Sequence, residues 1–189
     1  MAAKVLHNRF TELELNLIYN EVRALLKLND ATNAHTQGIL DFNFYGEIRL
    51  SSNRVAKTAY FIMPVEEHGE FFSLIEKTQG GFSEPIARQL FRNLVDSVDF
   101  IHSRNIGHRD IKTENLLLTG EFVLKLCDMG SSCTLQKNGK DDIVTPMEAI
   151  GSPEYNPPEL NTNEASDSES AIKAGDIFSL GCVLFLMVM

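Results

Sequence analysis

Cysteine is scarce in this sequence, and the few cysteines form no recognisable cluster. Only Cys127, Cys133 and Cys182 occur among 189 residues, and their spacing fits no metal site. An odd and sparse set of thiols is also unlike a disulfide framework. We therefore expect a protein of a reducing compartment, the cytoplasm or the nucleus.

Positive charge is also in short supply. The chain carries 17 lysines and arginines against 26 aspartates and glutamates, which gives a net charge of −9. This balance argues against a nucleic-acid-binding surface and provides no long-range attraction for a phosphate ligand. Any phosphate would have to be bound by cations placed close to it.

Long hydrophobic runs are missing as well. Residues 1–20 mix charged, polar and apolar side chains and do not resemble a signal peptide. The apolar stretch from Ile177 to Met189 has about 13 residues, whereas a helix that crosses a bilayer needs roughly 20. We expect no membrane span and interpret this stretch as a buried helix that is cut off. No internal repeat is visible.

The apolar pattern of the first part predicts one helix and two strands. Apolar side chains recur at helical spacing from Ile18 to Leu26, which predicts a helix over residues 12–28. Residues 39–65 contain two apolar segments on either side of turn-forming residues 51–53. These segments predict two antiparallel strands joined by a turn.

The second part is predicted to be mainly helical. Ser83 and Pro85 open a helix whose apolar stripe continues to Ile101. Two short strands are then expected at Leu116–Leu118 and Phe122–Leu126. They are followed by a long loop at 131–158 and an exposed acidic insertion at 161–170.

One stretch points directly to a chemical function. It reads His108-Arg109-Asp110-Ile111-Lys112-Thr113-Glu114-Asn115, and Asp128-Met129-Gly130 follows thirteen positions after Asn115. This stretch sets a candidate base, a cation and two candidate magnesium ligands at the spacing that phosphoryl transfer requires. A charged surface loop would explain any one of these residues, but not the whole set. The stretch resembles the catalytic loop of eukaryotic protein kinases, His-Arg-Asp-Leu-x-x-x-x-Asn followed by Asp-Phe-Gly.

Three further segments resemble motifs of the same family. Residues 1–6 are similar to the strand motif Val-Ala-Ile-Lys, and residues 151–159 to the end of the activation segment, Gly-Thr-x-x-Tyr-x-Ala-Pro-Glu. Residues 176–181 resemble Asp-x-Trp-Ser-x-Gly. The resemblance covers roughly residues 1–189. It implies an α+β, two-lobed protein-kinase-like fold. The partial β-rich N-lobe would be residues 1–63, the hinge 64–68 and the partial helical C-lobe 69–189, which includes the activation segment 128–159.

The resemblance implies a Ser/Thr protein kinase that uses ATP and Mg²⁺. Asp110 would accept the proton of a protein Ser or Thr hydroxyl, and Lys112, which is typical of the Ser/Thr-specific branch, would face the transferred phosphoryl group. Asn115 and Asp128 would bind magnesium, which prefers hard oxygen ligands. Residues in the first part would bind the nucleotide: Lys4, held by Glu21, would pair the α- and β-phosphates.

The adenine site and the regulatory residues also follow from the resemblance. Met63 would limit the depth of the adenine pocket, backbone groups of Pro64 and Val65 (or Glu66) would face the adenine edge, and Leu117 would pack under the ring. Cys127 would border the site as a target for electrophiles. Other family roles fall on Ser152 and Asp176 (bracing the catalytic loop), Arg109 (docking a phosphorylated loop, with Thr134 and Thr145 as candidate hydroxyls) and Glu70 and Glu114 (selecting arginine in a basophilic substrate).

Departures from the family pattern keep other interpretations open. No glycine-rich loop precedes Met1, the later C-lobe helices are missing after Met189, and Met129 replaces a phenylalanine. Glu159 would then be buried without its usual arginine or exposed to solvent. The alternatives are a catalytically inactive kinase-like scaffold that binds partners, and a fragment of a longer kinase.

Overall fold

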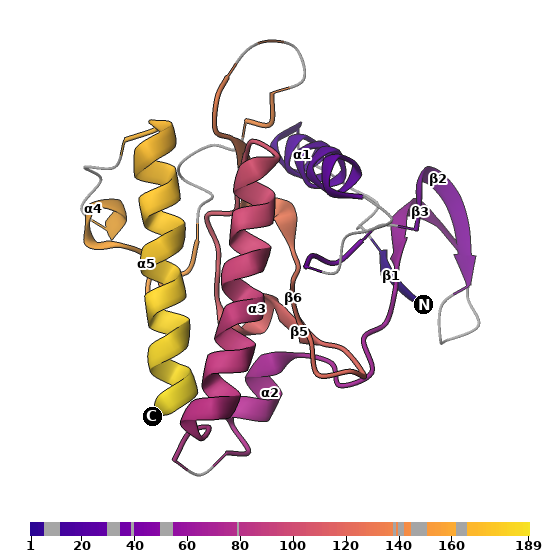
Figure 1. Ribbon diagram of the computed structural model, residues 1–189. Helices are drawn as coiled ribbons and strands as arrows, with labels where there is room; N and C mark the ends of the chain where they lie inside the picture. Colours follow the sequence, from indigo (N-terminus) through magenta and orange to yellow (C-terminus); the bar gives the residue numbers. More distant parts are fainter. Residues whose placement is uncertain are drawn as a thin grey trace.

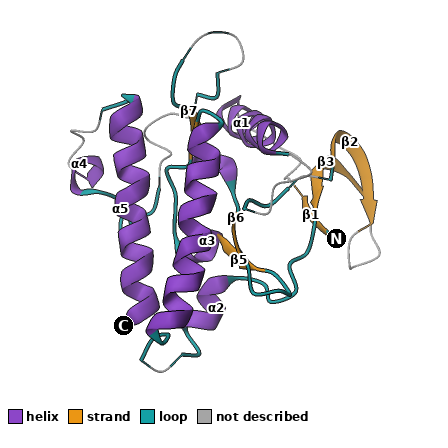
Figure 2. Cartoon of the chain, in the orientation of Figure 1, coloured by secondary structure: helices purple, strands orange, loops and turns teal. Residues whose placement is uncertain are grey.

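The computed structural model combines a small sheet with a larger helical part (Figures 1 and 2). It describes residues 1–5, 12–29, 35–38, 40–49, 55–78, 80–137, 139, 142–144, 151–161 and 166–189. Helices make up most of the regular secondary structure of the described residues, and the strands form one three-stranded sheet and two two-stranded ones. The fold is therefore of the mixed α and β class that the sequence predicted.

The first part contains the three-stranded sheet and one long helix. Strands β1 (Ala2–Val5), β3 (Val55–Met63) and β2 (Asp41–Arg49) are antiparallel and lie in the order β1-β3-β2. Helix α1 (Glu12–Leu28) buries Val22, Leu25 and Leu28. The structure confirms the predicted helix and strand pair. The predicted turn at 51–53 lies outside the described residues.

The helical part is built around two antiparallel neighbours, α3 (Glu84–Ser103) and α5 (Glu169–Val188). Leu94, Ile101 and Val183 are fully buried in the core. Burial of one such side chain stabilises a fold by roughly 1.5–3 kcal/mol, so the apolar stripe predicted to end at Ile101 contributes to the stability of this core. The short helices α2 (Phe71–Ile75) and α4 (Pro158–Asn161) lie beside this pair.

Short strands carry the loops that matter for the candidate site. The hairpin of β5 (Leu116–Leu118) and β6 (Leu124–Leu126) follows the 3₁₀ turn η1 (Thr113–Asn115) and ends just before the 3₁₀ turn η2 (Met129–Ser131). Strand β4 (Ile106–Gly107) pairs with β7 (Cys133–Thr134). The prediction of an irregular loop over 131–158 was wrong at β7, because a two-residue strand is too short to show a period.

Two further predictions need correction. Strand β6 begins at Leu124 rather than at Phe122, which occupies the preceding turn with a φ of 60°. Helix α5 begins at Glu169, within the segment expected to be an exposed insertion. The hydroxyl of Ser168 caps the helix by accepting a hydrogen bond from the backbone N–H of Ala171 (3.3 Å), so a polar cap was misread as a loop.

Helix α5 is consequently longer than the apolar stretch suggested. It has 20 residues and is, by length and composition alone, the one helix of the described chain that could cross a membrane. Its residues Leu180, Val183 and Met187 are nevertheless buried in the core, and its Asp176 is almost completely buried at a polar junction. This packing favours a core helix of the domain.

Candidate functional site

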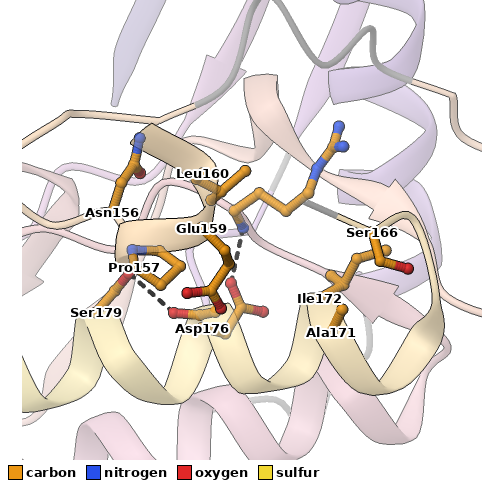
Figure 3. A pocket seen from close by; sticks show the side chains of 11 residues that line it. Asn156, Pro157, Glu159, Leu160, Ser166, Ala171, Ile172, Asp176 and Ser179 are labelled. Carbon is orange, nitrogen blue, oxygen red and sulfur yellow. Dashed lines mark hydrogen bonds between the residues drawn. The ribbon is translucent and has the colours of Figure 1, made fainter. Parts of the chain in front are cut away.

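The backbone of the loop 108–115 is anchored by a buried carboxylate on α5. Asp176 is 1% exposed, and its oxygens accept hydrogen bonds from the backbone N–H groups of His108 (3.0 Å) and Arg109 (2.8 Å). His102 on α3 donates to the same carboxylate through Nε2 (2.8 Å). Figure 3 shows Asp176 projecting from α5, beside Glu159 and Pro157. Three donors thus compensate for the burial of this acid and fix the start of the loop.

Asp110 lies at the centre of a compact polar cluster. Its Oδ2 is 3.1 Å from Lys112 Nζ and accepts a hydrogen bond from Asn115 Nδ2 at 3.0 Å. Its Oδ1 accepts from Ser152 Oγ at 3.1 Å, and Lys112 Nζ in turn donates to Ser152 Oγ at 2.8 Å. The structure therefore brings together Asp110, Lys112 and Asn115, and it joins them to Ser152 of the distant segment 151–159.

Gly151 explains how the segment 151–159 can approach this loop. It has a φ of +71°, and a Cβ there would lie 2.3 Å from Asn156 Oδ1 and 3.0 Å from the carbonyl oxygen of Arg109. Only glycine combines this conformation with such close contacts. The residue allows Ser152 to reach Asp110.

Asp128 is brought next to Asn115 by backbone contacts at the end of β6. Cys127, which precedes Asp128, donates its N–H to the carbonyl oxygen of Asn115 at 2.9 Å. His108, fully buried, links the same strand end to the loop: Nδ1 accepts from the N–H of Asp110 (3.2 Å), and Nε2 contacts the carbonyl oxygen of Cys127 (3.0 Å). A proton on Nε2 satisfies both contacts. The two candidate magnesium ligands are thus carried by adjoining segments.

Lys4 connects the sheet to the candidate magnesium site. Its Nζ lies 2.5 Å from Glu21 Oε1 on α1 and 3.6 Å from Asp128 Oδ1. Burial alone would lower the pKa of Lys4, but the attraction of Glu21 and Asp128 is larger in sum and raises that pKa. Lys4 therefore remains positively charged and available to an anion. The spacing of 17 residues between Lys4 and Glu21 brings the two side chains together, as predicted.

The carboxyl groups beside Lys4 respond in opposite directions. Burial raises the pKa of Glu21 more than Lys4 lowers it. For Asp128, burial also acts to raise the pKa, but Lys4 and the N–H of Gly130 outweigh it and lower the pKa below the usual aspartate range. Asp128, which is half-exposed, is therefore the better placed of the two to stay ionised and bind a cation.

The predicted adenine-binding residues lie where β3 ends. Met63 is the last residue of β3, and Val65 is exposed. The carbonyl oxygen of Pro64 accepts a hydrogen bond from Gln37 Nε2 at 2.6 Å. Glu66 forms an ion pair with Lys125 of β6 at 2.9 Å. Leu117 in β5 is half-buried, and its backbone forms an isolated antiparallel β-bridge with Glu70.

Sequence reasoning missed Gln37, Lys125 and His102. Their partners lie 27, 59 and 74 positions away along the chain. No local pattern marks such pairs, so no signal in the sequence could have found them.

The structure contradicts two of the predicted accessory roles. Burial raises the pKa of the Cys127 thiol to about 12, which is unlike a reactive cysteine. Thr134 is 1% exposed, and its hydroxyl accepts a hydrogen bond from the N–H of Ile143 at 2.7 Å, so a modifying enzyme could not reach it in this conformation. Thr145 lies outside the described residues.

The other residues with predicted regulatory or substrate-selecting roles lie at or near the surface or form hydrogen bonds. Arg109 Nε donates to the carbonyl oxygen of Ser131 at 2.9 Å. Glu114 accepts hydrogen bonds from Thr113 (2.9 Å) and Tyr155 (3.4 Å), and Glu70 is exposed. Glu159 is exposed rather than buried. None of these positions decides which substrate the chain would select.

The donor set fits magnesium bound together with a nucleotide. Among the described residues, no group of three or more His, Cys, Asp or Glu side chains is arranged to hold a metal ion by itself. Magnesium, however, is usually held by one or two carboxylates with phosphate and water oxygens. Because Asn115 uses its amide nitrogen on Asp110, its amide oxygen is the group left for a cation. Asp128 and Asn115 therefore suffice chemically.

Comparison with known proteins gives consistent matches. The whole chain, residues 1–189, matches the family model of the protein kinase domain. It is 32% identical to the serine/threonine-protein kinase PKH2 of Saccharomyces cerevisiae, over 99% of the chain and 16% of that protein. Its identity to PKH1 of the same yeast is 34%, over 99% of the chain and 24% of the relative. The CBL-interacting serine/threonine-protein kinase 16 of Arabidopsis thaliana is 38% identical over 70% of the chain and 28% of the relative.

The chain thus spans less than a third of the length of each of these relatives. All three are Ser/Thr kinases by name, and the family model covers every residue from 1 to 189. The chain belongs to the protein kinase domain family, and its similar relatives are Ser/Thr kinases.

Proposed function

We propose that this chain is a two-lobed Ser/Thr protein kinase domain that transfers the γ-phosphoryl group of ATP to a protein hydroxyl. One observation carries the proposal: the Asp110 carboxylate is surrounded by Lys112, Asn115 and Ser152 within hydrogen-bonding distance. Such a cluster positions a proton acceptor and a cation at one point, which is what phosphoryl transfer asks of a protein.

The chemistry assigns a role to each residue of the cluster. Asp110 accepts the proton of the attacking Ser or Thr hydroxyl. The hydroxyl oxygen of the substrate bonds to the γ-phosphorus as the bond between this phosphorus and ADP breaks. Lys112 stabilises the negative charge on the transferred group. Asn115 and Asp128 would hold magnesium, which would supply positive charge to neutralise the phosphates.

Residues of the first part bind the nucleotide in this proposal. Lys4, oriented by Glu21, pairs the α- and β-phosphates. Met63, the backbone of Pro64 and Val65 (or Glu66), and Leu117 form the adenine site. The substrate is a protein Ser or Thr, and Glu70 and Glu114 would favour nearby arginines. The small and odd number of cysteines supports a reducing compartment, and we propose the cytoplasm or the nucleus.

The test is phosphate transfer from MgATP to a peptide library by the 189-residue chain and by Asp110→Ala. Loss of a general base costs about 10²- to 10⁴-fold in rate, so the variant should be nearly inactive. Asp99→Ala, on the exposed face of α3, is the matched control and should keep full activity. Equal transfer by the wild type and Asp110→Ala would refute the enzymatic assignment.

A non-catalytic binding module is the second candidate. It is favoured by apolar side chains on α5 that face solvent, namely Ile177 (57% exposed), Phe178 (44%) and Phe185 (59%). Surfaces of this kind commonly mark interaction sites. A chain that binds partner proteins but shows no Asp110-dependent transfer would support this alternative.

A further inference from the structure

Gln37 makes an unusual link between β6 and the segment that follows β3. Its backbone N–H donates to the carbonyl oxygen of Leu126 at 2.8 Å, and the N–H of Leu126 donates to the carbonyl oxygen of His35 at 3.0 Å. The side chain of Gln37 is buried, with 3% exposed. This residue is therefore fixed on β6 and cannot turn outward without breaking its backbone contacts.

The side-chain amide of Gln37 forms a hydrogen bond with the backbone carbonyl of Pro64. Nε2 donates to that oxygen at 2.6 Å. Only the NH₂ end of an amide can donate to a carbonyl, so Oε1 must point elsewhere. In the described part of the chain, Oε1 of Gln37 is the one buried side-chain nitrogen or oxygen atom that lacks a partner. The side chain thus provides a donor for the Pro64 carbonyl oxygen and leaves its own oxygen, Oε1, without a hydrogen bond.

A second link keeps Pro64 in this position. Lys125, the neighbour of Leu126 on β6, pairs with Glu66 at 2.9 Å, and the Glu66 carboxylate side chain is only 9% exposed. Proline has no backbone N–H, so its carbonyl oxygen is its sole backbone hydrogen-bonding group. The segment 64–66 is held at both ends, and the carbonyl cannot easily move away from Gln37.

We propose that Gln37 is a positioning residue that sets the base selectivity of the nucleotide site. This rests on the proposed function, in which the Pro64 carbonyl faces the adenine edge. A carbonyl oxygen that already accepts a strong hydrogen bond is a weaker acceptor for the 6-amino group of adenine. A site with a free carbonyl would prefer ATP over a purine triphosphate that lacks the 6-amino group. Because the Pro64 carbonyl is already occupied, this site would show a weaker preference for ATP.

The test compares the binding of MgATP and of magnesium inosine triphosphate, which carries a carbonyl in place of the 6-amino group. Dissociation constants of both are measured by calorimetry for the wild type, Gln37→Leu and Gln37→Asn, whose shorter amide cannot reach Pro64. Gln89→Leu, on the exposed face of α3, is the matched control. We expect both Gln37 variants to raise the preference for ATP by about fivefold, the effect of one neutral hydrogen bond.

The ratio of the two constants separates this role from a structural one. A merely structural Gln37 would weaken both nucleotides equally and leave the ratio unchanged, which would overturn the inference. If neither nucleotide bound to the wild type, the proposed function would fail and this inference with it. Unfolding of both Gln37 variants, seen by circular dichroism, would also overturn it, because Gln37 would then be needed for the fold.

Discussion

The two sides of the candidate site are held in place in very different ways. On one side, the loop 108–115 is fixed by groups from Cys127 directly after β6, from the segment 151–159 and from α5. On the other side, Lys4 reaches the site through one ion pair with Glu21 and a longer contact with Asp128, and 38% of its side chain is exposed. The side that we propose to accept the proton is therefore held rigidly by several contacts, whereas the side that we propose to bind phosphate depends on a few charges.

This contrast has a consequence for mutations. Changes at the anchored loop should reduce both stability and activity, because they leave buried polar groups unpaired. Changes at Lys4 should reduce activity while the fold persists.

Asp176→Ala should have the largest effect. It removes the acceptor for the N–H groups of His108 and Arg109 and for His102, all of which are then left with unpaired donors. We expect a loss of about 3 kcal/mol in the free energy of unfolding, together with loss of transfer activity. Urea denaturation measures the first quantity. Asp167→Ala, which removes an exposed contact of 3.9 Å to Lys137 and no acceptor of the anchored loop, is the control and should change stability by about 1 kcal/mol or less.

Lys4→Met should separate activity from stability. Loss of the cation removes electrostatic stabilisation of the phosphates, and we expect transfer to fall about 100-fold. The free energy of unfolding should fall by less than in Asp176→Ala. Lys4 is more than a third exposed, and the buried Glu21 that loses its partner can become neutral, because burial already raises its pKa. A loss of stability as large as that of Asp176→Ala would contradict the contrast between the two sides.

Ser152→Ala should have a moderate effect on transfer. It removes the hydroxyl that joins Asp110 to Lys112, but those two side chains still contact each other directly at 3.1 Å. We expect transfer to slow by about tenfold. Ser152→Thr keeps the hydroxyl and should retain activity; equal losses in both variants would show that the hydroxyl is not the cause.

The pKa of Asp128 should rise in Lys4→Met. Among the groups that lower this pKa in the wild type, Lys4 has the largest influence. A lowered folded-state pKa means that ionised Asp128 stabilises the fold above the usual aspartate pKa and that this contribution is lost as the pH falls through the folded-state value. The variant should therefore lose less stability on acidification. Carboxyl ¹³C chemical shifts, recorded against pH for both proteins, measure the change directly.

Cys127 should show the smallest effect. Because burial raises the pKa of its thiol to about 12, we expect almost no reaction with a disulfide reagent at pH 8 in the folded chain. Mass spectrometry of the labelled protein, with Cys127→Ala as the control, identifies which thiol reacts. Rapid labelling at Cys127 would show that this end of β6 opens readily.

The local parts of the fold could be predicted from the sequence. Helices α1 and α3 follow from apolar residues at helical spacing, because each of them buries one face. The start of α5 could not, since the cap at Ser168 lies in a polar segment that also looks like a loop. The pairing of β4 with β7 could not be predicted either. Each strand has two residues, and their pairing depends on contacts between segments that are distant in the sequence.

The candidate site divides in the same way. Asp110, Lys112 and Asn115 are near neighbours in the sequence, so their proximity could be foreseen. The anchoring of the Pro64 carbonyl by Gln37 could not, because it is created by the packing of three separate segments. Burial also overturned the expected reactivity of Cys127, and burial is a property of the folded chain.

The most direct measurement is a crystal structure of the chain with magnesium and a non-hydrolysable ATP analogue. We predict a magnesium ion about 2.0–2.1 Å from oxygens of Asn115 and Asp128, with Lys4 on the α- and β-phosphates and Asp110 facing the γ-phosphate. A nucleotide bound elsewhere, or a metal ion that contacts neither Asn115 nor Asp128, would contradict the account.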